Sequence, residues 1–184
     1  MAIDIPNMIL IGATARNSGK TTLAVAIIEK YKEKMPVYGI KVTTIDSNHR
    51  QCVHGGEGCG ACSNLAGDFE ITEEVLRDEK KDTVLLLAGG AKKVYWLKTI
   101  NTCMAKGIET VISRIPKEAL IICESNTLRK VVNPGIFVMV RNTRDSQMKN
   151  TAAAVIDQAD IVFENRFDGK IETVLDEIAQ KMNL

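Results

Sequence analysis

Four consecutive residues near the start of the chain, Gly19-Lys20-Thr21-Thr22, have the chemistry of a phosphate-binding site. They follow an apolar run and precede a segment with helical spacing, so we expect them at a helix N-terminus, where free N–H groups attract anions. Glycine lets the backbone approach a phosphate, the lysine can reach the β- and γ-phosphates, and the first threonine can bind Mg²⁺. The predicted nucleotide-binding residues are Asn17, Ser18, Gly19, Lys20, Thr21 and Thr22.

This segment matches only the second half of the phosphate-loop pattern G-x-x-x-x-G-K-[ST]. The leading glycine would fall at position 14, where the chain has Thr14, and the nearest upstream glycine, Gly12, comes two residues too early. The alternative is a chance Gly-Lys-Thr in a surface loop. The strand predicted before the segment and the helix predicted after it favour phosphate binding.

A second short pattern, Asn142-Thr143-Arg144-Asp145, follows another apolar run. It is similar to the N-K-x-D motif of GTP-binding proteins, with threonine in place of lysine. The carboxylate of Asp145 can accept hydrogen bonds from guanine N1–H and its 2-amino group, a donor pair that adenine lacks, and Asn142 would brace the loop and touch the base. The alternative is a solvated turn that caps a following helix.

Magnesium bound to a nucleotide normally takes a carboxylate ligand besides the threonine of the phosphate loop. Glu124 ends the apolar run "ALIICE", and Asp46 closes "KVTTID" after the second predicted strand. In an open α/β sheet both strand ends lie at the carboxyl edge, where ligands bind. Thr21, Asp46 and Glu124 are therefore the predicted Mg²⁺ ligands, and Lys20, Thr21 and Glu124 the predicted catalytic residues.

A cysteine-rich stretch, "CVHGGEGCGAC", offers a second metal site. Cys59 and Cys62 have the C-x₂-C spacing with which two thiolates hold one metal, and Cys52 or His54 could complete the ligand set. Zn²⁺ and an iron–sulfur cluster both suit such ligands. With three or four ligands per chain, a site shared across a homodimer is also open. The alternative is a flexible loop with reduced thiols.

Composition narrows the class of protein. The 184 residues are 45% hydrophobic but only 4% aromatic, so the core must be aliphatic. The net charge of +1 does not suggest a nucleic-acid or membrane partner. No membrane-spanning run and no export signal are visible, so a cytoplasmic protein is expected. Five cysteines, an odd number, argue against a disulfide framework, and Cys103 and Cys123 are expected to be plain core residues.

Strands and helices are predicted to alternate along the chain, which is typical of a mainly parallel sheet with helices on both faces. The sequence indicates one domain over residues 1–184, with a Cys/Gly-rich insert at about 47–68. The predicted strands are 8–13, 37–42, 94–97, 119–123, 136–141 and 161–164. The predicted helices are 19–31, 72–77, 84 to about 89, 102–114, 146–159 and 170–182.

Several of these stretches together resemble the molybdopterin-guanine dinucleotide biosynthesis protein B family of P-loop GTP-binding proteins. They are "NSGKTTL" from Asn17, "IKVTTID" from Ile40, "KDTVLLLAGGAKKV" from Lys81 and "IICESN" from Ile121. The resemblance implies a three-layer P-loop NTPase fold, GTP with Mg²⁺, slow hydrolysis, and an accessory role beside a nucleotidyltransferase of molybdenum-cofactor biosynthesis. The chain departs from the family at Thr14, in "TTIDSNHRQC", and at Ser125, where the family has glycine.

Three other functions remain open. The run "CVH" looks similar to the Cys-Pro-His of urease-type nickel chaperone GTPases, which suggests a metallochaperone. A small-molecule kinase or synthetase would bind its acceptor in the long loop from Thr43 to Asp68. A regulator would bind nucleotide without turnover. Nucleotide-dependent metal affinity, phosphate transfer to an acceptor, or binding without hydrolysis would distinguish them.

Overall fold

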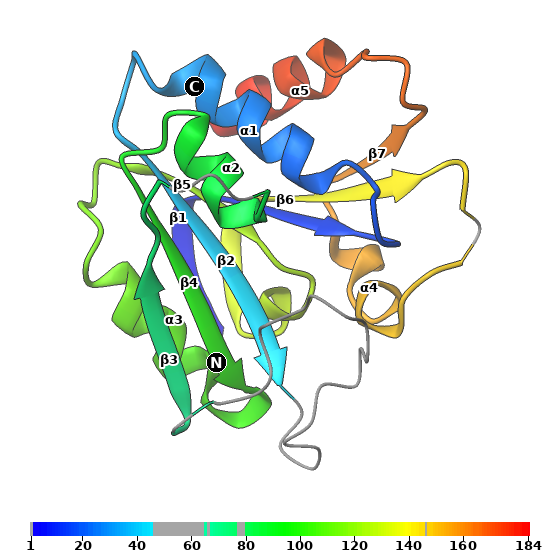
Figure 1. Ribbon diagram of the computed structural model, residues 1–184. Coiled ribbons are helices and arrows are strands. Elements are labelled where there is room, and N and C mark those ends of the chain that lie inside the picture. Colours follow the sequence, from blue (N-terminus) through cyan, green and yellow to red (C-terminus); the bar gives the residue numbers. More distant parts are fainter. Residues whose placement is uncertain (1, 46–64, 66, 77–79, 146) are drawn as a thin grey trace.

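The computed structural model describes residues 2–45, 65, 67–76, 80–145 and 147–184. Within them, seven strands form one sheet in the order β3-β4-β2-β5-β1-β6-β7 (Figure 1), in which β3 alone is antiparallel to its neighbour. The strands are β1 Ile3–Ala13, β2 Val37–Ile45, β3 Phe69–Glu73, β4 Lys93–Ile100, β5 Leu120–Glu124, β6 Val132–Asn142 and β7 Ile161–Asn165. The helices are α1 Lys20–Tyr31, α2 Asp82–Ala88, η1 Asn101–Cys103, α3 Met104–Ile112, η2 Thr127–Lys130, α4 Asn150–Ala153, η3 Ile156–Gln158 and α5 Glu172–Met182.

The sheet is buried on both faces, which explains its nearly continuous apolar strands. In β1, Met8 and Leu10 point into one core and Ile9 and Ile11 into the other. Helices α1, α2 and α5 cover the face of Ile9 and Ile11, and α3 and α4 pack on the opposite face (Figure 1). The predicted α/β class with a mainly parallel sheet is confirmed. None of the described helices is long and apolar enough to cross a membrane.

The helix predicted from 84 to about 89 and the strand predicted at 94–97 are both present. Helix α2 ends at Ala88, and Gly90 takes a left-handed φ of 110° before β4 begins. Position 90 therefore needs glycine, because other residues rarely adopt that backbone conformation. Strand β4 then pairs with β2 along eight residues.

The helix predicted at 72–77 is wrong. Phe69–Glu73 forms strand β3, which lies antiparallel on the edge of β4. Phe69 and Ile71 pack against the core, while Glu70 lies opposite Lys98, with which it makes a 3.9 Å ion pair. This two-residue alternation, together with the open edge of β4, outweighs the local helix signal of "TEEVLR".

The long helix predicted at 146–159 is wrong as well. The described part of that stretch contains only α4 Asn150–Ala153 and the 3₁₀ turn η3 Ile156–Gln158. Lys149 has an extended backbone, and its N–H donates to the carbonyl of Thr14 at 2.8 Å. This tertiary hydrogen bond holds the chain extended where the sequence alone favours a helix.

Candidate functional site

A hollow of about 1150 Å³ lies at the carboxyl edge of the sheet, large enough for a nucleotide. Its wall combines the loop before α1, the end of β2, the segment after β5, the start of α4 and the turn after β7. The lining residues used below are Arg16, Asn17, Ser18, Gly19, Lys20, Thr21, Thr22, Thr43, Thr44, Asp82, Ser125, Asn126, Thr127, Lys149, Thr151, Phe163, Asn165 and Phe167. Of the eight residues predicted to bind nucleotide, the six from Asn17 to Thr22 are among them, and Asn142 and Asp145 are not.

Two residues of the loop before α1 have an unusual backbone conformation. Asn17 and Gly19 both have left-handed conformations, with φ of 53° and 85°. Ser18 closes the loop on itself: its buried hydroxyl donates to the carbonyl of Ala15 at 2.9 Å and accepts from its N–H at 3.2 Å. A Cβ at Gly19 would lie 2.3 Å from Nδ2 of Asn165, so only glycine fits there.

The departure at Thr14 has a structural explanation. Thr14 is buried and has no positive φ, so glycine is not needed at this position. Its hydroxyl oxygen accepts a hydrogen bond from the backbone N–H of Asn142 at 3.3 Å. The threonine thus ties the start of the loop to the end of β6, a contact that glycine could not make.

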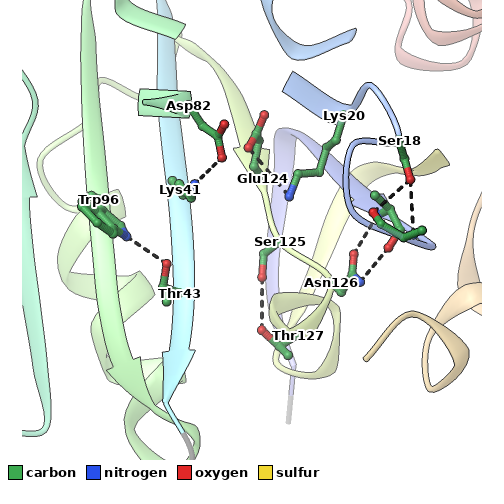
Figure 2. Close-up of polar contacts among 12 residues, drawn as sticks. Ser18, Lys20, Lys41, Thr43, Asp82, Trp96, Glu124, Ser125, Asn126 and Thr127 are labelled. Carbon is green, nitrogen blue, oxygen red and sulfur yellow. Dashed lines mark hydrogen bonds and ion pairs between the residues drawn. The ribbon is translucent and has the colours of Figure 1, made fainter. Parts of the chain in front are cut away.

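Asn126 anchors the end of β1 immediately before the loop. Its Oδ1 accepts from the N–H of Ala13 at 2.7 Å, and its Nδ2 donates to the carbonyl of Ala13 at 2.9 Å (Figure 2). We call this pair of hydrogen bonds between Asn126 and Ala13 the Asn126 clamp. A Cβ at Gly12 would lie 2.8 Å from that Oδ1, so glycine at this position leaves room for the clamp. The same Nδ2 also donates to Thr151 at 3.2 Å, which brings the start of α4 to this point.

Lys20 and Glu124, both predicted from the sequence, face one another across the loop. The Lys20 ammonium lies 3.7 Å from a carboxylate oxygen of Glu124 (Figure 2). Glu124 is only 1% exposed, and neither of its oxygens accepts a hydrogen bond from the described residues. A buried carboxylate with free lone pairs is costly unless a cation or donor joins it, so this site suits an added metal ion.

A second ion pair, Lys41 with Asp82, lies beside the loop and was not singled out by the sequence. It joins β2 to the first turn of α2, and Asp82 lines the hollow (Figure 2). Burial alone would raise the pKa of Asp82, but the hydrogen bond from Lys41 and the charges of Lys41 and Lys20 outweigh it and hold that pKa below its ordinary value. Both residues fall within stretches that carry the family resemblance.

The side chains of Asn142 and Asp145, predicted to read the base, make hydrogen bonds close to their own positions in the chain. Asn142 is buried, and its Oδ1 accepts from the N–H of Arg144 at 2.9 Å. Asp145 accepts from the N–H of Gln147 at 2.9 Å, and neither residue is among the described residues that line the hollow. These side chains act within their own turns, which is the alternative considered for the pattern.

Two aromatic residues line the hollow on the side of β7. Phe163 and Phe167 line the hollow, and the Arg144 guanidinium lies 4.7 Å from the ring centre of Phe167. Between them in the sequence, Asn165 donates from Nδ2 to the carbonyl of Ser18 at 2.9 Å, which links this wall to the loop before α1. Phe163 and Phe167 belong to no recognisable sequence motif, so the sequence did not indicate that they line a site.

The remaining predicted site residues fall outside the described part of the chain. These are Asp46 and the candidate zinc or iron–sulfur ligands Cys52, His54, Cys59 and Cys62. Among the residues that are described, no group of three or more His, Cys, Asp or Glu could hold a metal. Of the two other cysteines, Cys103 is half-buried, and Cys123 is a buried residue of β5 whose thiol pKa is raised by burial.

Comparisons with protein-family models, with curated proteins and with solved structures found no match for this chain. The hollow itself combines a loop with two left-handed residues, a lysine at the start of a helix, a buried carboxylate and an aromatic wall.

Proposed function

We propose that this chain is a P-loop NTPase that binds a nucleoside triphosphate with Mg²⁺ in the hollow and hydrolyses it slowly. The observation that carries the proposal is the placement of Lys20. It lies at the start of α1, directly after left-handed Gly19, with its ammonium 3.7 Å from the buried Glu124. A helix N-terminus, a flexible cation and a strand-end carboxylate are the parts that phosphoryl transfer uses.

Each residue has a distinct part in the proposed chemistry. Lys20 would turn from Glu124 to the β- and γ-phosphates, and the N–H groups at the start of α1 would bind the same phosphates. The Thr21 hydroxyl and the Glu124 carboxylate would hold Mg²⁺, which would neutralise part of the charge of the phosphates. The base would stack on Phe163 or Phe167, which recognise any aromatic ring.

GTP is the nucleotide that the family resemblance implies, and the pathway rests on that resemblance alone. On this basis the chain would assist a nucleotidyltransferase of molybdenum-cofactor biosynthesis as a GTP-binding accessory protein. One observation favours a small-molecule kinase instead. Hydroxyl groups line the hollow beyond the phosphate loop, with Thr44 and Thr127 2.6 Å apart and Ser125 3.2 Å from Thr127. Transfer of phosphate to a hydroxylated acceptor, rather than to water, would establish that alternative.

The test is nucleotide binding with and without Mg²⁺, for GTP and ATP. Trp96, the one tryptophan of the chain, donates from Nε1 to Thr43 on the wall of the hollow at 2.9 Å, so its fluorescence is a convenient readout. We expect micromolar or tighter binding that Mg²⁺ strengthens. In Glu124→Gln, binding should persist but lose most of its Mg²⁺ dependence. If neither nucleotide binds the unmodified chain in Mg²⁺, the proposal is wrong.

A further inference from the structure

Lys149 approaches the hollow from the side of the sheet opposite to α1. Its backbone N–H is fixed on the carbonyl of Thr14, and Ala152, one turn later, is buried in the core of the opposite face. Thr151 accepts from Asn126, which follows Glu124 by two residues. The Lys149 side chain therefore starts from the gap between the ends of β1 and β5, toward which Lys20 reaches from α1.

Three cationic side chains lie close together in this part of the hollow, which favours the binding of an anion. Arg16, Lys20 and Lys149 all line the hollow, and no carboxylate of the described part pairs with Arg16 or Lys149. Burial, followed by repulsion from Lys20 and Arg16, lowers the pKa of Lys149 below its ordinary value. Lys20 has Glu124 as its counter-ion, but Arg16 and Lys149 have no carboxylate partner in the described part, and a bound polyphosphate would remove the repulsion among the three cations.

We propose that Lys149 binds the terminal phosphate and stabilises the charge that develops as that phosphate leaves. The inference rests on the proposed function and deepens it. The oxygen of a water molecule forms a bond to the terminal phosphorus, and the bond from this phosphorus to the bridging oxygen breaks. The bridging oxygen keeps the electron pair on the nucleoside diphosphate, and the protons of the water pass to the released phosphate and to solvent. Lys149 supplies from within the chain the cation that some nucleotide hydrolases receive from a partner.

The position of Lys149 indicates the terminal phosphate rather than the first one. The first phosphate must lie toward the base, whose proposed wall is formed by Phe163 in β7 and Phe167 in the turn after it. Lys149 instead contacts Thr14 at the end of β1 and precedes the contact between Thr151 and Asn126. The last phosphate, held by Lys20 near Glu124, is the one that lies toward this gap.

The experiment compares a ground-state ligand with a transition-state mimic. The full chain and its variants are titrated with GDP, and with GDP plus aluminium fluoride, and phosphate release from GTP is measured; a parallel series uses ADP and ATP. In Lys149→Met we expect GDP affinity within about twofold of the parent. Affinity for GDP with aluminium fluoride, and kcat, should fall about 100-fold or more. Lys149→Arg should recover part of both, and Lys106→Met, at an exposed lysine of α3, should change neither.

The outcomes separate this inference from the proposed function. If the unmodified chain binds no nucleotide, both fail. If it binds nucleotide but Lys149→Met keeps the parent's kcat and fluoride affinity, only the role of Lys149 is wrong. An equal loss of affinity for GDP and for the fluoride complex also contradicts it, because the effect must be confined to the transition state. Should the methionine variant not fold, Lys149→Gln replaces it in the same comparison.

Discussion

Two short polar segments resemble nucleotide-binding motifs, Ser18–Thr22 and Asn142–Asp145. They differ in whether they line the hollow. All five residues of the first segment line the hollow. The second uses its side chains to close its own turns, and its backbone supports the first through the contact of Asn142 with Thr14. A phosphate loop needs a strand before it and a helix after it, and both are visible in the sequence. A four-residue base-reading pattern needs one side chain aimed correctly, which no local pattern ensures.

Removing the loop's cation should have the largest effect. Lys20→Met takes away the ammonium that the proposal directs at the β- and γ-phosphates, and we expect GTP affinity to fall at least about 100-fold, or about 2.7 kcal/mol. Calorimetry with GTP and Mg²⁺ measures it. Lys30→Met is the matched control, because Lys30 is on the same helix and pairs with Asp176 at the surface. Unchanged affinity in Lys20→Met would remove the phosphate-loop assignment.

The next effect concerns the clamp that holds the loop in place. Asn126→Ala leaves the N–H and carbonyl of Ala13 without their side-chain partner, and we expect the free energy of unfolding to fall by about 2 kcal/mol. Urea unfolding measures this loss. Asn133→Ala, which removes an exposed contact with Asp4, should cost less than about 0.5 kcal/mol. Equal losses in the two variants would show that the clamp has no special role.

A smaller, pH-dependent effect is expected at Asp82. Because its pKa is lowered in the folded chain, the pair with Lys41 adds stability above about pH 4 that is lost as pH falls through the folded pKa. Asp82→Asn should therefore cost at most about 1 kcal/mol at pH 7, since the side chain is partly exposed and water screens the pair. In strong acid the Asp82 carboxylate is protonated, so the difference in unfolding free energy between parent and variant should vanish. Unfolding of the parent and variant at pH 7 and about pH 2.5 tests this; a difference independent of pH would contradict it.

The smallest effect is expected at Asp145, and it sharpens the comparison between the two segments. Since one of its oxygens already accepts from Gln147, and the residue is not among those described as lining the hollow, Asp145→Asn should change the ratio of GTP to ATP affinity by less than about twofold. Competition between the two nucleotides measures the ratio. A tenfold loss of GTP affinity, with a gain for xanthosine triphosphate, would restore the guanine-reading role predicted from the sequence.

Much of the fold could be predicted because its signals are local. The apolar runs of β1, β5 and β6 are long enough to identify buried strands, and the spacing of Leu23 and Ile27 predicts α1. Helix α2, followed by β4, was predicted from the glycine pair at 89–90. The errors lie where a distant partner decides. Strand β3 exists because β4 offers an open edge, and the helix predicted at 146–159 is interrupted because Lys149 is bound to Thr14.

The same division holds for the candidate site. The sequence by itself determined the glycine and the lysine at the start of α1 and the carboxylate at the end of β5, since each depends on neighbours within a few residues. Only the tertiary structure decided that Glu124 faces Lys20, that Asn126 clamps Ala13, and that Lys149 reaches the hollow from the other side. The parallel strands carry these residues to one edge from positions more than 100 residues apart. Such proximity depends on strand order, and no local pattern of residues encodes it.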